Sequence, residues 1–204
     1  MFNKIIILDC CFAGGFAGLA FRNEEVNLKN GITVLASSRA NESSLDNNGH
    51  GLFTRLLIDS LNGEASDILG NITPASIYSH IDKSLAFLDQ RPLYFANNSR
   101  FISLRKIKPA VSFQDIQSIL KLFKDSDRKK LDPSYEPTPD KLNHEYPPNP
   151  DHTKQFAIMQ RLNRVNLVVP ISRAHMFDEA MNFGGCKLTR SGIYYKKLLI
   201  ANLM

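Results

Sequence analysis

The chain has 204 residues, of which 43% are hydrophobic and 22% are charged, and its formal net charge is +5. This length is enough for one core of ordinary size and a smaller unit, and no segment approaches the ~20 consecutive apolar residues that a membrane helix needs. Three cysteines, an odd number, are typical of free thiols in a reducing compartment rather than of a disulfide framework. These features predict a cytoplasmic protein with no membrane partner.

An unbroken apolar run, Ile5 to Leu8, opens the chain and is followed by Asp9, Cys10 and Cys11. Such a run predicts a strand that is buried on both faces of a parallel sheet. Functional loops of α/β proteins gather at the carboxyl ends of these strands. Because neighbouring side chains at a strand end point to opposite sides, we expect Cys10 to be buried and Cys11 to face a substrate.

The remaining elements follow from apolar periodicity and capping residues. Strands are predicted at 34–38, 92–96 and 101–105. Helices are predicted to begin near Leu52, Thr73, Ser112, Ser172 and Thr189. The predicted fold class is therefore α/β, with helices flanking a sheet and with further helices toward the carboxyl terminus.

Proline marks the domain organisation, because six of the ten prolines lie between residues 133 and 150. That stretch has too few apolar residues to pack, so it predicts an extended linker. We divide the chain into residues 1–108, a helix and proline-rich linker over 109–154, and a small, basic, mainly helical domain over 155–204. Leu188-Thr189 followed by Gly192 is similar to the last helix of winged-helix units, which leaves a winged-helix-like fold as an alternative.

Positive charge is concentrated after the linker, where residues 151–204 hold 8 Lys and Arg against 3 Asp and Glu. A basic unit suits either nucleic acid or an acidic protein surface. The cations are scattered rather than gathered in one run, which favours a solvated basic surface. We therefore expect a protein partner for this unit and no nucleic acid.

The residues after the first strand resemble the nucleophile motif of the caspase and metacaspase superfamily. The metacaspase form reads Asp-x-Cys-His-Ser-Gly, and this chain reads Asp9-Cys10-Cys11-Phe12-Ala13-Gly14. The segment from Val34 to Asp46 is similar to the family's next strand and substrate loop, and Gln90-Arg91-Pro92 resembles the Gln-x-Pro before its last strand. The resemblance covers residues 1 to about 105. It implies a mostly parallel caspase-like sheet, flanked by helices, whose amino-terminal part is missing.

This resemblance implies a hydrolase of the cysteine-type endopeptidase class, acting in proteolysis on a peptide or protein substrate. Cys11 stands at the nucleophile position. Asp9 and Asp46 match the carboxylates that line a pocket for Arg or Lys at the cleavage site. Arg39 leaves open a pocket for an acidic residue instead. The family's chemistry uses no cofactor, and the cysteines and histidines lack paired metal-ligand spacing, so neither a cofactor nor a metal is expected.

The family's histidine base lies upstream of the cysteine by roughly 50 residues, whereas only ten residues precede Cys11. His50 lies downstream and is expected to help cap the following helix, with a role as the base as the alternative. We interpret the chain as the carboxyl-terminal part of a longer caspase-like protein, with the upstream half as a partner. The competing hypothesis is a catalytically inactive caspase-like scaffold that binds partners through its basic carboxyl-terminal unit.

Overall fold

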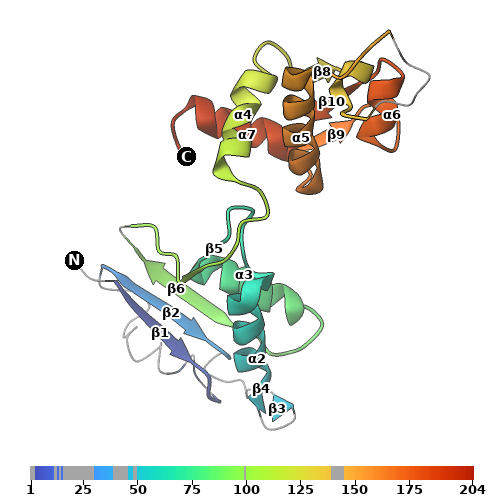
Figure 1. Cartoon of the computed structure of the whole chain (residues 1–204). Helices are drawn as coiled ribbons and strands as arrows, with labels where there is room; N and C mark the ends of the chain where they lie inside the picture. The colour runs from blue at the N-terminus through green and yellow to red at the C-terminus, as the bar shows by residue number, and fades with distance from the viewer. Residues whose placement is uncertain are drawn as a thin grey trace. The chain divides into compact units, whose positions relative to one another are not determined.

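The chain forms two compact units, Met1–Pro109 and Ala110–Met204, in the computed structural model (Figure 1). The structure describes residues 3–11, 13, 15, 30–38, 46–47, 50–98, 100–138 and 145–204, and for residues 46, 47 and 50 it describes the backbone. Both units are mixed α/β, with small sheets flanked by helices. In the described part of the chain, no helix combines the length and the apolar character needed to cross a bilayer.

Among the described residues, the first unit is built on a sheet of three strands in the order β1-β2-β6: β1 (Lys4–Leu8), β2 (Ile32–Ala36) and β6 (Leu93–Asn97). β1 and β2 are parallel, and β2 and β6 are antiparallel. In the register, Leu8 lies opposite Ala36, which lies opposite Leu93. The carboxyl ends of β1 and β2 and the start of β6 therefore share one edge of the sheet.

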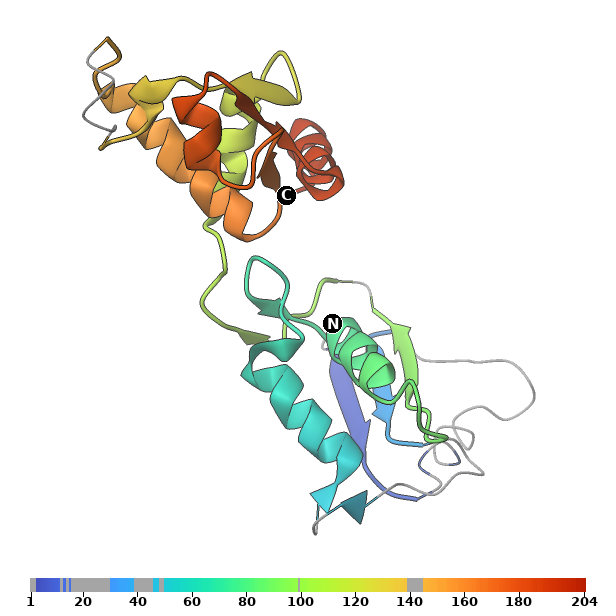
Figure 2. The same ribbon diagram turned by 90° about the vertical axis from the view of Figure 1, so that its right-hand side faces the viewer.

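Two helices, α2 (Leu52–Asp59) and α3 (Pro74–Ser84), cover one face of this sheet (Figure 2). The predicted cap at Thr73 is confirmed, because its side chain accepts a hydrogen bond from Ser76 N and Ser76 Oγ accepts one from Thr73 N. Apolar side chains from the helices, from β2 and from the short strand Asn71–Ile72 form the core, namely Leu35, Phe53, Ile72, Ile77, Ile81 and Leu85.

Short elements connect these parts: β3 (Asp46–Asn47), β4 (His50–Gly51), a π-helical turn (Ser60–Glu64), β5 (Asn71–Ile72) and β7 (Arg105–Lys106). The strand predicted at 101–105 is thus reduced to the two residues of β7, which pair with β5. The π-helical turn follows α2 directly, and its helical backbone is interrupted at Gly63, whose φ of 139° lies in the region that glycine tolerates best.

β1 is less buried than its apolar run predicts. Its central side chains Ile5 and Ile6 are half-buried, and Ile7 is 40% exposed. Within the described residues β1 pairs with β2 alone, so β1 is an edge strand there. The prediction of a strand buried on both faces is therefore wrong for the described structure, because the side chains of an edge strand have same-face neighbours from another strand on one side alone.

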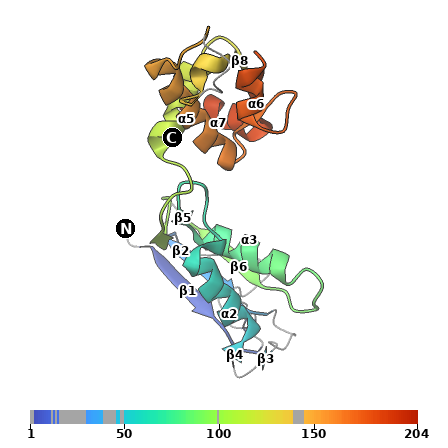
Figure 3. The same ribbon diagram turned by 45° about the vertical axis from the view of Figure 1, so that its right-hand side comes forward.

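In the described residues of the second unit, helices surround a small antiparallel sheet that the sequence pattern did not predict (Figure 3). Its elements are α4 (Phe113–Leu122), β8 (Arg128–Lys130), a 3-10 turn (Pro133–Tyr135), α5 (Pro150–Arg164), β9 (Val168–Pro170), α6 (Met176–Met181), β10 (Gly185–Leu188) and α7 (Arg190–Ile200). The sheet has the order β8-β10-β9. The predicted caps Ser112 and Thr189 each accept a backbone hydrogen bond at the start of α4 and α7.

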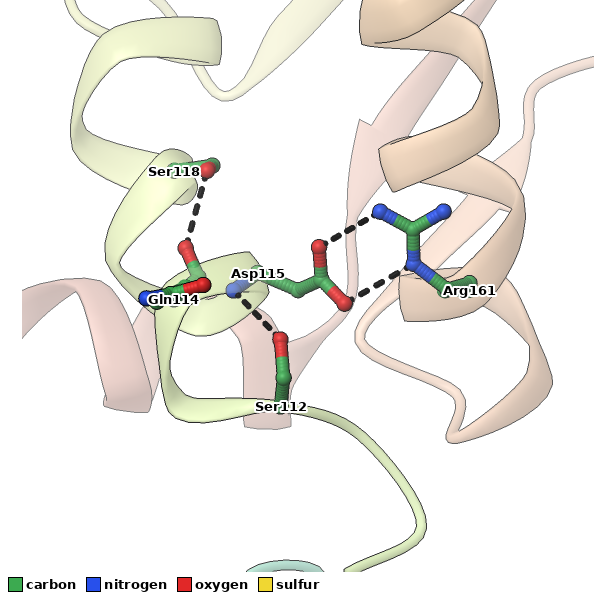
Figure 4. Close-up of polar contacts among 5 residues, drawn as sticks. All are labelled: Ser112, Gln114, Asp115, Ser118 and Arg161. Carbon is green, nitrogen blue, oxygen red and sulfur yellow. Dashed lines mark hydrogen bonds and ion pairs between the residues drawn. The ribbon is translucent and has the colours of Figure 1, made fainter.

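Helix α4 belongs to this second unit, since it packs against α5 and α7. Asp115 of α4 is joined to Arg161 of α5 by two hydrogen bonds of 2.7 and 2.8 Å (Figure 4). The hydrogen bonds from Arg161 lower the pKa of Asp115, although burial acts in the opposite direction. The two units divide between Pro109 and Ala110, so α4 and Pro133–Tyr135 both lie within the second unit.

Candidate active site at the end of the first strand

Cys10 and Cys11 lie in a turn directly after β1, and both side chains are exposed. The carbonyl oxygen of Cys10 accepts a hydrogen bond of 3.2 Å from Ala13 N, which closes the turn. The expectation that Cys10 is buried is wrong. The strand ends at Leu8, so the alternation of side chains along a strand no longer applies at Cys10.

Two serines after β2 hold this turn. Ser37 N donates to Leu8 O at 2.9 Å, and Ser37 Oγ donates to Cys10 O at 3.2 Å. Ser38 Oγ donates to the same Cys10 oxygen at 3.4 Å. Both serines are fully buried. The backbone just before Cys11 is therefore attached to the end of the neighbouring parallel strand.

A third element reaches the same place from the start of β6. The Gln90 side chain is buried, and its Nε2 donates a hydrogen bond of 2.7 Å to Ser37 O. Sequence reasoning placed Gln90 in a Gln-x-Pro motif but did not identify this contact, nor the bonds from Ser37 and Ser38. The sequence signal for these contacts was limited to the polar residues that follow β1 and β2.

The carboxylate of Asp9 lies at the amino-terminal end of α2. Its Oδ2 accepts a hydrogen bond of 2.5 Å from Thr54 Oγ1, in the first turn of the helix. A side chain at Gly51 would place its Cβ 2.6 Å from Asp9 Oδ2, so glycine is required there for the approach. The amino-terminal end of a helix carries a partial positive charge, which favours a carboxylate at this position.

Asp46 comes close to the same point through its backbone. In the β3–β4 pair, Asp46 lies opposite Gly51, the residue whose Cα is adjacent to the Asp9 carboxylate. The structure thus brings the backbone of Asp46 and the carboxylate of Asp9 to the same glycine. The Asp46 side chain lies outside the described residues, and so does Arg39.

His50 is described through its backbone in β4, and its side chain lies outside the description. Helix α2 begins after Gly51, which has no side chain to cap it. Within the part of the chain that the structure describes, no histidine is hydrogen-bonded to Cys11.

Cys186 differs from the pair after β1 and is buried, as the sequence predicts. Burial raises the pKa of its thiol to about 12. Its Sγ lies 3.5 Å from Met159 Sδ in the core of the second unit. A thiol in this state is not a nucleophile at neutral pH, because the thiolate is the reactive form.

The described residues contain no group of three or more His, Cys, Asp or Glu side chains arranged to hold a metal ion. No protein-family model and no curated protein sequence matches the chain.

Proposed function

We propose that this chain carries the nucleophile of a caspase-like cysteine endopeptidase and that Cys11 is the attacking residue. The observation that supports this most is the exposed Cys11, which follows the carboxyl end of β1 in a turn attached to the parallel strand β2. A nucleophile must be accessible and also held in position by the surrounding structure.

In the proposed reaction, Cys11 Sγ as the thiolate attacks the scissile carbonyl carbon, and the carbonyl electron pair moves to the oxygen. The backbone N–H of Cys11 donates a hydrogen bond to this oxyanion, which lowers the barrier by about 3 kcal/mol. The carbonyl then re-forms, the C–N bond breaks and a thioester results. The leaving amine takes a proton from the family's histidine base. Water then hydrolyses the thioester and regenerates the thiol.

The proposed specificity is cleavage after Arg or Lys. Asp9 Oδ2 is directed to Thr54 at the start of α2, and the backbone of Asp46 lies opposite Gly51 beside it. Two carboxylates at this position would form charge-assisted hydrogen bonds with a guanidinium or an ammonium group. A pocket based on Arg39 would instead favour an acidic residue in the substrate.

We infer a caspase-like, mostly parallel sheet that continues beyond β1 with strands from an upstream polypeptide segment. The incomplete burial of Ile5, Ile6 and Ile7 supports this inference, because a further strand would cover them. The family's histidine base would belong to that segment.

A catalytically inactive scaffold is the second candidate. Its support is the basic carboxyl-terminal part of the chain, where residues 151–204 hold 8 Lys and Arg against 3 Asp and Glu. In that case the partner contacts would run through the second unit, and Cys11 would be an ordinary exposed thiol.

Affinity labelling separates the two candidates. We would treat the 204-residue chain with peptidyl acyloxymethyl ketones that end in Arg, Lys or Asp and locate the adduct by mass spectrometry. We expect the Arg and Lys probes to label Cys11 at least tenfold faster than the Asp probe, with Cys11→Ala losing the adduct and Cys10→Ala keeping it. Asp46→Ala should reduce the preference for Arg by about tenfold, because a desolvated charge pair contributes roughly 1.5 to 3 kcal/mol.

Equal labelling of Cys10 and Cys11, without preference for the terminal residue, would support the scaffold. Faster labelling by the Asp probe would indicate that the specificity pocket is based on Arg39 rather than on Asp9 and Asp46.

A further inference from the structure

Strand β8 of the second unit lies within a concentration of positive charge. Four exposed cations lie on β8, at the carboxyl end of α4 or between the two elements, namely Lys121, Lys124, Arg128 and Lys130. None of the four forms an ion pair with another described residue, whereas nearby Asp127 is paired with Lys196 at 2.9 Å. These four cations are therefore available to form ion pairs with an acidic partner.

The backbone of β8 also has an open side. The sheet order β8-β10-β9 places β8 at an edge of the described sheet. Leu188 N donates to Asp127 O, and Leu131 N donates to Gly184 O, so residues 127, 129 and 131 direct their backbone groups toward β10. The alternate residues Arg128 and Lys130 direct theirs toward the edge.

Of these edge groups, Arg128 N already donates to Ser126 Oγ at 3.1 Å. The carbonyl of Arg128 and both backbone groups of Lys130 face the edge with no hydrogen bond to another described residue. Lysine on an edge strand discourages pairing with a second copy of the same strand, because the like charges repel. The same charge favours an acidic strand.

A pocket lies on each side of this edge. The first, about 390 Å³, spans the sheet from β8 to the residues after β9, and its lining includes Arg128, Lys130, Ile171, Phe183 and Gly185. Glu179 also lines it, but that carboxylate already accepts hydrogen bonds from the backbone of Ser172, Arg173 and Gly185.

The second pocket, about 350 Å³, lies between β8 and the carboxyl end of α4 and includes Lys121, Lys124 and Asp125. Ser126 and all three β8 residues line both pockets. Side chains of a strand alternate between its two sides. A strand laid along β8 would therefore reach both pockets.

Phe183 gives the first pocket an apolar contact at a conformational cost. It follows α6 with a φ of 54°, a left-handed conformation that is common for glycine and unfavourable for a bulky aromatic residue. Its side chain is 54% exposed and makes an edge-on contact with Tyr146. An exposed aromatic ring at a strained position, next to Ile171 which is 38% exposed, suits an apolar side chain of a ligand.

We propose that the β8 edge binds an extended acidic segment of a partner protein, which adds as a further strand and places an apolar side chain against Ile171 and Phe183. Backbone hydrogen bonds to Arg128 and Lys130 give affinity, and the surrounding cations select carboxylates. This site lies within the second unit and does not depend on the proposed peptidase activity.

The probe is a fluorescein-labelled peptide of sequence Glu-Leu-Glu-Leu-Glu-Leu-Glu, titrated with the full 204-residue chain and followed by fluorescence anisotropy. We expect saturable binding that weakens as salt rises and that is at least tenfold weaker when Gln replaces Glu in the peptide. Arg128→Glu and Lys130→Glu should each weaken binding at least tenfold. Lys154→Glu, which makes the same charge change at an exposed position on α5, should weaken it less than twofold.

Two further measurements test the geometry. N-methylation of the peptide at one set of alternate residues should abolish binding, and N-methylation of the other set should leave it nearly unchanged, because only one edge of an added strand faces β8. Phe183→Gly should weaken binding about fivefold while the thermal midpoint stays the same or rises, since glycine relieves the left-handed backbone.

The proposal is overturned if both N-methylated peptides bind like the parent, or if Lys130→Glu has no more effect than Lys154→Glu. Tighter binding of a twelve-residue oligothymidylate than of the acidic peptide would assign the surface to nucleic acid instead. Should Phe183→Gly unfold the unit, the Lys130→Glu comparison and the methylation pattern still decide the question.

Discussion

At the scale of single residues, the three cysteines occupy two different environments. Cys10 and Cys11 are exposed in the turn after β1, whereas Cys186 lies in the core of the second unit against Met159. Accessibility and thiolate formation together control the rate of thiol modification. The rate of chemical modification should therefore distinguish Cys10 and Cys11 from Cys186.

We expect Ellman's reagent to modify two thiols of the native chain at pH 8 and the third only after unfolding in denaturant. Burial raises the pKa of Cys186 to about 12, so its thiolate is scarce as well as inaccessible. Cys186→Ser should leave the two rapid reactions unchanged, and Cys11→Ala should remove one of them. Three equal rates in the native protein would contradict the buried position of Cys186.

Glu179 is the most strongly perturbed carboxylate of the second unit. Burial alone would raise its pKa, but hydrogen bonds from the backbone N–H groups of Ser172, Gly185 and Arg173 and from the Ser172 hydroxyl lower the pKa to about 2. These bonds fasten the segment after β9 to the start of β10. The carboxylate therefore serves the packing of this unit.

Glu179→Gln should destabilise the second unit by about 3 kcal/mol, because the amide NH₂ would face backbone donors and leave at least one of them unsatisfied. A depressed folded-state pKa means that the stabilisation is present above the usual 4.5 and is lost as pH falls toward about 2. Urea unfolding followed by circular dichroism between pH 7 and pH 2 measures both effects. Asp178→Asn is the matched control, and an equal loss in both variants would contradict the role of Glu179.

At the scale of elements, β1 combines an apolar sequence with an incomplete sheet. Ile5, Ile6 and Ile7 follow one another in a strand that pairs with β2 alone among the described residues. Edge strands of this kind present unpaired backbone groups and apolar side chains, and they promote association unless a charge or a covering segment protects them.

We expect Ile7→Lys to reduce self-association of the full chain, measured as light scattering at increasing protein concentration, by severalfold. A charge on an exposed edge position opposes strand-to-strand pairing. Phe87→Lys removes a fully exposed aromatic residue from the loop after α3 and serves as the control for a general gain in polarity. If both variants reduce scattering equally, the β1 edge is not the surface that associates.

At the scale of the whole molecule, the two units divide at Pro109 and Ala110. The second unit includes α4 and β8, because β8 pairs with β10 and α4 contacts α5 and α7. The buried side chains of this unit come from both sides of the proline-rich stretch and include Ile116, Ile119, Phe123, Phe156, Met159 and Leu162. Its core is therefore shared across that stretch.

Residues 110–204 expressed alone should show a cooperative thermal transition by circular dichroism, because they contain the whole of this core. Residues 155–204 alone should not, since they lack α4, β8 and the first residues of α5. A cooperative transition of residues 155–204 alone would indicate that the proline-rich stretch is the boundary between two folding units.

Local chemistry in the sequence was sufficient for much of the fold. β1 follows from an apolar run. The starts of α3, α4 and α7 follow from Thr73, Ser112 and Thr189, each of which accepts a hydrogen bond from the backbone N–H three residues further on. Such signals are readable because the interacting groups are close in the chain. The predicted start of α6 at Ser172 is wrong, and the helix begins at Met176. The N–H and the hydroxyl of Ser172 are hydrogen-bonded to the Glu179 carboxylate.

The candidate site was predictable in part for the same reason. A strand followed by Asp9 and Cys11 is a local pattern, and the sequence alone singled out both residues. The contacts that position them join distant segments: Ser37 to Cys10, Gln90 to Ser37, and Thr54 to Asp9. No periodicity encodes such contacts, because they depend on how the strands pair.

The sequence by itself determined the class of fold, the exposed cysteine after the first strand and most helix starts, all through interactions between near neighbours. Only the tertiary structure decided the exposure of Cys10, the short strands of the second sheet and the inclusion of α4 and β8 in the second unit. These depend on pairing across long separations, as between Asp115 and Arg161, which stabilises the unit only once the chain between them has folded.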